Sequence, residues 1–101
     1  MVTIQGHNNL TSAERAARIA QYIEQDPQRP WPGSERIKDF HTPVWALIGH
    51  YQHGAGQSVE MVARDYHLSV EAVETAILFY RTDRRARTAI DGHFAANEPP
   101  A

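Results

Sequence analysis

The side chains best suited to bind a charged partner are four arginines that fall within seven residues: Arg81, Arg84, Arg85 and Arg87. Guanidinium groups pair bidentately with phosphates and with carboxylates. On a continuous helix, their spacing would place Arg81, Arg84 and Arg85 on one face. The run therefore predicts a contact with nucleic acid or with an acidic protein surface. The alternative is a solvated helix face on which Asp83 and Asp91 are the ion-pair partners.

Six histidines raise the question of a metal site. His50 and His53 are three residues apart, and His41 lies upstream of them. A zinc site needs further ligands at characteristic spacings, and no carboxylate or other histidine shows such a spacing. We expect these three histidines to be capping or surface residues, and we expect no metal.

The sequence patterns of common catalytic sites are missing. There is no phosphate-binding loop, no His-Glu-x-x-His pair and no nucleophile elbow. Ser58 and Ser69 stand where helices are expected to begin, so helix capping explains them. We therefore expect a binding protein with no catalytic residue and no cofactor.

Composition limits the class of protein further. The chain has 101 residues, 42% of them hydrophobic, no cysteine and a formal net charge of -2. A single domain of this size buries a modest core, which favours a homodimer. The lack of cysteine fits a reducing compartment, and no apolar run approaches the roughly 20 residues of a membrane span. We expect a cytoplasmic protein in which any contact with DNA depends on local positive charge.

Residues 58–78 have the pattern of two helices joined by a tight turn. Ala63 supplies the small residue that a helix crossing requires, and Val73 and Ile77 are spaced to face inward. His67 stands at a turn position that favours a left-handed backbone. Ser69 can then cap the second helix. This pattern predicts a helix-turn-helix.

The second helix of that pair could read DNA or could serve for packing and dimerisation. The residues expected to be exposed near its start are Ser69, Val70, Glu71, Glu74 and Thr75. Groove-reading helices usually carry arginine, lysine, asparagine or glutamine there. Glu71 and Glu74 would instead face phosphates and oppose the release of counterions. We favour packing or dimerisation and keep DNA readout as the alternative.

The N-terminal third predicts one helix and a loop. Thr11 and Glu14 form a capping box, and Pro27 should end the helix near Gln25. The apolar face expected for this helix consists of Ala13, Ala16, Ala17, Ala20 and Ile23. Residues 26–34 hold three prolines, so they predict a loop, with Trp31 packed onto the helices. Residues 35–40 are either a short strand or extended chain.

Two further helices complete the expected core. Thr42 and Pro43 should cap and begin one helix, which Gly54 and Gly56 should end. Another helix should run from Ser69 without interruption towards Gly92. The prediction is an all-α protein, a small helical bundle. It has an N-terminal arm, helix and linker at residues 1–34, a helix-turn-helix core at 35–96 and a disordered tail at 97–101.

The helical part of the chain resembles a known bacterial family. The run TPVWALIGHYQ at residues 42–52, followed by SVEMVARDYHLSVEAVETAILFYRTDR at 58–84, is similar to the domain of unknown function family numbered four hundred and thirty-three. The family's hallmarks correspond here to Pro43, Val44 and Trp45, to the glycine loop at 54–56, to Asp65 and Tyr66, and to Phe79 and Tyr80. Residues 11–37 resemble the N-terminal extension of a subgroup.

The resemblance implies a homeodomain-like helix-turn-helix fold and an antitoxin of VapB type. Such proteins neutralise a PIN-like ribonuclease toxin and repress their own operon. We therefore expect a non-catalytic antitoxin whose arginines approach the carboxylates that hold the toxin's catalytic metal. The alternatives are a homodimeric DNA-binding regulator and a structural or adaptor dimer.

Overall fold

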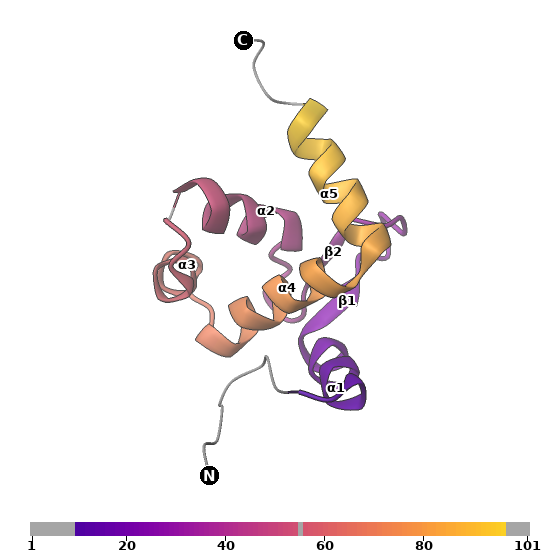
Figure 1. Cartoon of the computed structure of the whole chain (residues 1–101), viewed down its shortest axis with the longest axis horizontal. Helices are drawn as coiled ribbons and strands as arrows, with labels where there is room; N and C mark the ends of the chain where they lie inside the picture. Colours follow the sequence, from indigo (N-terminus) through magenta and orange to yellow (C-terminus); the bar gives the residue numbers. More distant parts are fainter. Residues whose placement is uncertain (1–9, 55, 97–101) are drawn as a thin grey trace.

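The computed structural model describes residues 10–54 and 56–96 and places one helix at the centre of a small bundle (Figure 1). This helix, α4 (Val70–Thr82), contacts α1 (Ser12–Tyr22), α2 (Val44–Gly49), α3 (Val59–Tyr66) and α5 (Arg84–Ala96). Its buried residues are Ala72, Val73, Thr75, Ala76, Ile77, Leu78 and Phe79. A helix that is apolar on most sides is stabilised by burial, so α4 forms the core element.

Helix α1 begins as the sequence predicts but packs differently. The Glu14 amide donates to Thr11 Oγ1 at 3.1 Å, and the Thr11 amide donates to Glu14 Oε1 at 2.8 Å. These hydrogen bonds hold the pKa of Glu14 below its ordinary value. The prediction of an alanine core face is wrong, because Ile19 and Tyr22 pack on the core instead. The exposed alanines are Ala13, Ala16, Ala17 and Ala20.

A two-stranded antiparallel sheet follows α1. Strand β1 (Ile23–Gln25) pairs with β2 (Glu35–Ile37), with Ile23 opposite Ile37. Both isoleucines are buried, so the pair anchors the sheet to the core. Of the two alternatives left open for residues 35–40, the structure has the short strand, over Glu35–Ile37. The expected helix end near Gln25 is wrong, because α1 ends at Tyr22. Three residues are too few for a reliable local pattern, and pairing across the loop decides their conformation.

Helix α2 starts one residue later than expected. Pro43 is its N-cap and has no side-chain capping bond, so the prediction that Thr42 caps the helix is wrong. The Thr42 carbonyl instead accepts from the Ile37 amide at 2.7 Å, which ties this turn to β2. Val44, Leu47 and Ile48 are the buried residues of this helix. A π-helical turn, η2 (His50–Gly54), continues α2.

Helices α3 and α4 are joined by a short turn with the expected capping. His67 adopts the left-handed conformation, with φ 58° and ψ 40°. Ser58 accepts from the Met61 amide at 3.2 Å, and Ser69 accepts from the Ala72 amide at 3.1 Å. Each serine satisfies an amide that the first helical turn leaves without a partner.

The long final helix expected from the sequence is two helices. Asp83 has an extended backbone, with ψ 104°, and its Oδ1 accepts from the Ala86 amide at 2.9 Å. Aspartate is among the preferred N-cap residues, so α5 begins afresh at Arg84. Gly92 lies inside α5 and does not end it. Ala86 and Ile90 are the buried residues of α5, and the helix extends away from the bundle towards the C-terminus (Figure 1).

The sequence predicts a boundary between an N-terminal segment, residues 1–34, and a core, residues 35–96. Strand β1 lies before this boundary and β2 after it, so the sheet joins the two segments. The expected tail at 97–101 lies outside the described residues. Within residues 10–54 and 56–96, no helix is both long and apolar enough to cross a bilayer.

Candidate functional site

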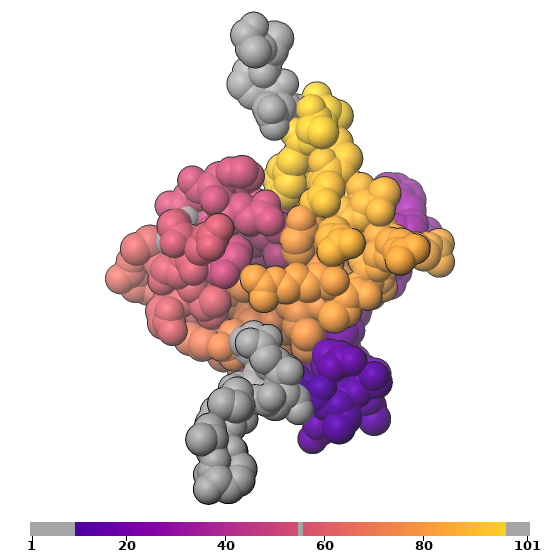
Figure 2. All heavy atoms as spheres, viewed as in Figure 1, coloured from indigo at the N-terminus to yellow at the C-terminus, as the bar shows by residue number. Residues whose placement is uncertain are grey.

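The four arginines surround the junction between α4 and α5. Arg81 lies in the last turn of α4, and Arg84, Arg85 and Arg87 lie in the first turns of α5. All four are exposed, and we call them the arginine cluster. The expectation that Arg81, Arg84 and Arg85 share one helix face is wrong, because the helix breaks at Asp83. Figure 2 shows the first turns of α5, in orange, at the outer edge of the molecule.

The local ion pairs expected for these arginines do not form. Asp83 accepts from a backbone amide at the start of α5, and Asp91 accepts from the Tyr80 hydroxyl at 2.5 Å. No carboxylate in the described part of the chain lies within 4.0 Å of a guanidinium nitrogen of the cluster. The cluster therefore presents positive charge that the described residues do not neutralise by ion pairing.

The position of three of these arginines adds to that positive potential. The N-terminus of a helix carries a partial positive charge, so cations in its first turn are unfavourable for the helix itself. Arg84, Arg85 and Arg87 all lie near the N-terminus of the 13-residue α5. An anion from outside the described residues would relieve this repulsion.

The hydrogen bond between Tyr80 and Asp91 links α4 to α5. Burial raises the pKa of the Tyr80 hydroxyl above its ordinary value, and the bond to Asp91 raises the pKa further. Hydrogen bonding to Gln52 and the charge of Arg87 act in the opposite direction.

We expect stability to fall as tyrosine ionises at alkaline pH. In the unfolded chain the hydroxyl ionises at about pH 10, while in the folded chain it stays protonated to a higher pH. The stabilisation from Tyr80 is thus complete below about pH 10 and decreases as the pH rises towards the folded pKa. In urea titrations, the difference in unfolding free energy between the wild type and Tyr80→Phe should shrink above about pH 10. A difference that is independent of pH would contradict this assignment.

The residues considered for DNA readout do not form one exposed surface. Ser69 and Val70 are exposed, but Thr75 is only 1% exposed and its hydroxyl donates to the Glu71 carbonyl at 2.7 Å. The expectation that Thr75 lies on the surface is therefore wrong. Its burial follows from the central position of α4, which neighbouring helices cover on several sides.

Helix α1 also engages the start of α4. The Tyr22 hydroxyl donates to Glu71 Oε2 at 3.1 Å, and Arg18 forms an ion pair with the same oxygen at 3.5 Å. Burial and this bond raise the pKa of Tyr22. Glu74 is partly buried and has interactions of its own. The carboxylate of Glu71 thus serves helix packing.

The histidines have separate structural environments. His50 Nε2 lies 2.9 Å from Asp65 Oδ2, and its ring packs edge-on against Tyr66. His53 faces the ring of Phe94, and His41 lies in a turn with φ 59°. Within residues 10–54 and 56–96, no three histidine, aspartate or glutamate side chains are grouped to hold a metal ion. Asp65 and Tyr66 both contact His50, and the spacing of these residues in the sequence did not indicate this contact.

The loop between β1 and β2 carries Trp31, whose predicted position is wrong, and Arg29, which the sequence did not indicate as a site residue. Trp31 was expected to pack onto the helices, yet 53% of it is exposed. It lines a hollow of about 320 Å³ with Arg29, Trp45 and His93, among other residues. Arg29 and His93 are distant in sequence, and only tertiary packing brings them together, so no local pattern could have identified this group.

Together, the helical fold and this surface define a small helical protein with an exposed tryptophan and a cationic patch that has no ion-pair partner among the described residues. No protein-family model matches the chain, and no curated protein or solved structure is similar enough to indicate a relationship. The features that bear on function are therefore the arginine cluster, the hollow lined by Trp31 and the motif resemblance.

Proposed function

We propose that the chain is a non-catalytic binding protein that acts as the antitoxin of a type II toxin-antitoxin pair and neutralises a PIN-like ribonuclease. The observation that carries this proposal is the arginine cluster, whose charges lack ion-pair partners among the described residues. A nuclease of that class holds its catalytic metal with carboxylates. Exposed guanidinium groups can pair with such carboxylates and block the site.

The same proposal assigns α3 and α4 to a homeodomain-like helix-turn-helix used mainly for packing. The left-handed His67 and the Ser69 cap support a helix-turn-helix. The burial of α4 supports its use as a core helix. The partner would then contact α5 and the end of α4 and would leave the start of α4 free of contact.

Finding a PIN-like nuclease encoded beside this chain, and co-expressing the two proteins, tests the proposal. We expect the two proteins to purify as one complex, in which RNA cleavage is inhibited. If the complex is denatured, the two proteins are separated and the nuclease is refolded alone, RNA cleavage should be restored. If the purified chain neither binds the nuclease nor slows cleavage when added in excess, the antitoxin function is wrong.

A homodimeric DNA-binding regulator is the second candidate. It is favoured by Arg81, Arg84 and Arg85, which lie near the C-terminal end of α4 and could contact phosphates. Ser69 and Val70, at the N-terminal end of α4, would face the groove of the DNA. The burial of Thr75 and the pairing of Glu71 weaken this candidate. This candidate predicts that the protein binds the promoter of its own gene specifically in a gel-shift experiment, and that this binding weakens steeply as the salt concentration rises.

The third candidate is a structural or adaptor dimer without either activity. The exposed alanines of α1 favour it, because small side chains allow two helices to approach closely. Sedimentation of the purified chain would distinguish a dimer from a monomer. A dimer that binds neither the nuclease nor DNA would support this candidate.

A further inference from the structure

Two hollows lie where the proline-containing loop, residues 26–34, meets α5. They share Pro32 in their linings, and their volumes are about 270 and 320 Å³. Arg85 lines the first hollow, and Ala89 and His93 line the second. These three residues are spaced by four along α5, so they lie on one face of that helix. We call the two hollows together the loop groove.

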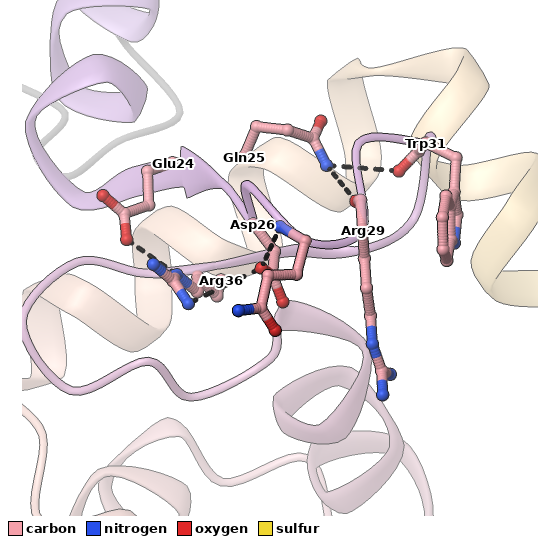
Figure 3. Close-up of polar contacts among 7 residues, drawn as sticks. Glu24, Gln25, Asp26, Arg29, Trp31 and Arg36 are labelled. Atoms are coloured by element: carbon pink, nitrogen blue, oxygen red, sulfur yellow. Dashed lines mark hydrogen bonds and ion pairs between the residues drawn. The ribbon is translucent and has the colours of Figure 1, made fainter.

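Hydrogen bonds hold the loop side of the groove in a defined conformation (Figure 3). The Gln25 amide nitrogen Nε2 donates to the carbonyls of Arg29 and Trp31, at 2.8 and 3.3 Å. Asp26 Oδ1 accepts from the Gln28 amide at 2.9 Å and lies 3.7 Å from Arg36. A surface that is ordered before binding loses less conformational entropy on binding.

An aromatic wall lines the second hollow. Trp31 is half exposed, and the ring of Trp45 lies 4.9 Å from that of His93. Arg29 and Trp31 extend from the loop to the same side in Figure 3, and both line this hollow. Exposed tryptophan beside arginine is typical of the residues that dominate protein interfaces.

The second hollow favours an acidic ligand, because Arg29 lines it and none of its described lining residues is a carboxylate. The first hollow is lined by Glu35 and Asp83 as well as by Arg85. These two carboxylates accept hydrogen bonds from backbone amides, Glu35 from Gly33 at 2.9 Å and Asp83 from Ala86 at 2.9 Å. No described carboxylate lies within 4.0 Å of the guanidinium groups of Arg29 and Arg85. The groove thus offers a cation in each hollow, with Pro32 between the two hollows.

We propose that the loop groove binds an extended acidic segment of a protein partner. One large apolar or aromatic side chain of that segment occupies the hollow lined by Trp31 and Trp45, and its carboxylates pair with Arg29 and Arg85. This site goes beyond the antitoxin function, because it does not require the partner to be a nuclease. A single nucleic acid strand fits less well, since it carries a phosphate at every nucleotide and some of these phosphates would meet Glu35 and Asp83, whereas a peptide segment needs carboxylates only at Arg29 and Arg85.

Selection from a displayed random peptide library tests the proposal with the full chain as the target. We expect the selected peptides to be enriched in aspartate or glutamate next to a leucine or an aromatic residue. The best peptide should change the tryptophan fluorescence of the chain. Its affinity should fall by at least about tenfold for Trp31→Ala and for the pair Arg29→Gln and Arg85→Gln.

The control variant is Phe40→Ala, because Phe40 is also a large exposed aromatic residue, 62% exposed and outside the groove lining. It should leave peptide affinity unchanged, and thermal melts should show that all variants fold. The proposal is overturned if no peptide is selected, if the peptides lack acidic residues, or if Trp31→Ala binds them as tightly as the wild type. Tighter, Trp31-dependent binding of oligothymidylate would also overturn it and would indicate a nucleic acid site. Because no nuclease is present, these outcomes do not depend on the antitoxin proposal.

Discussion

Replacing Arg84 and Arg85 together by glutamate is expected to weaken binding of the nuclease and its inhibition by at least about a hundredfold. Each substitution turns an attraction towards the carboxylates of the nuclease into a repulsion. Loss of folding is not the expected cause, because carboxylates in the first turn of α5 interact favourably with the helix N-terminus. Inhibition titrations of RNA cleavage and thermal melts of the same variant separate the two effects.

Arg64→Glu provides the matched control for each single substitution. Arg64 lies in α3, its side chain is 74% exposed, and it is outside the arginine cluster. It undergoes the same change of charge, so a general electrostatic effect would appear in it as well. We expect Arg84→Glu to weaken inhibition and Arg64→Glu to have little effect. Equal effects at the two positions, or unchanged inhibition by the double variant, would refute a role for the cluster.

Replacing Gly33 by alanine is expected to destabilise the protein by about 2–4 kcal/mol. Gly33 has φ +90°, a backbone conformation that side chains disfavour. A Cβ atom there would also lie 2.7 Å from Ala89 Cβ, so the loop would have to move away from α5. Urea titration at neutral pH measures this loss, and binding of the selected peptide should decrease with it.

Two companion variants separate the backbone effect from the steric effect. Gly56 also has a positive φ, +59°, but nothing lies within 4 Å of its Cβ position. Gly56→Ala should therefore cost only about 1–2 kcal/mol. Ala89→Gly removes the atom that meets the new Cβ, and by itself it costs about 1 kcal/mol through helix propensity.

In the double variant, Ala89→Gly should offset part of the damage from Gly33→Ala. The two effects should therefore sum to more than the destabilisation measured for the double variant. Strictly additive effects would show that the loop does not rest on α5 at this point. They would also remove the basis for a preformed loop groove.

The peptide experiment and the nuclease experiment concern adjoining surfaces, because Arg85 belongs to both. Arg81 and Arg84 lie outside the lining of the loop groove, whereas Arg29 and Trp31 lie outside the arginine cluster. Substitutions at these four residues therefore show whether one partner covers both surfaces. An effect of Trp31→Ala on nuclease binding would indicate that the acidic segment belongs to the nuclease.

The features that could be predicted from the sequence are those that depend on neighbouring residues. The capping box at Thr11, the Ser58 and Ser69 caps and the left-handed His67 all form through contacts within a few residues. A capping hydrogen bond links side chain and backbone within one turn, so residue type and spacing are enough to predict it. The largely helical fold follows from the same local preferences and from the apolar periodicity.

Which surfaces are covered depends on the packing of distant segments. This packing buries Thr75 in the centre of the bundle, leaves the alanines of α1 exposed and makes a strand of residues 23–25 by pairing them with residues 35–37. The helix break at Asp83 could not be predicted from neighbouring residues either, because aspartate occurs inside helices as well as at their N-caps. Burial and strand pairing depend on partners far away in sequence, and a periodic pattern shows which face is apolar without showing what will cover it.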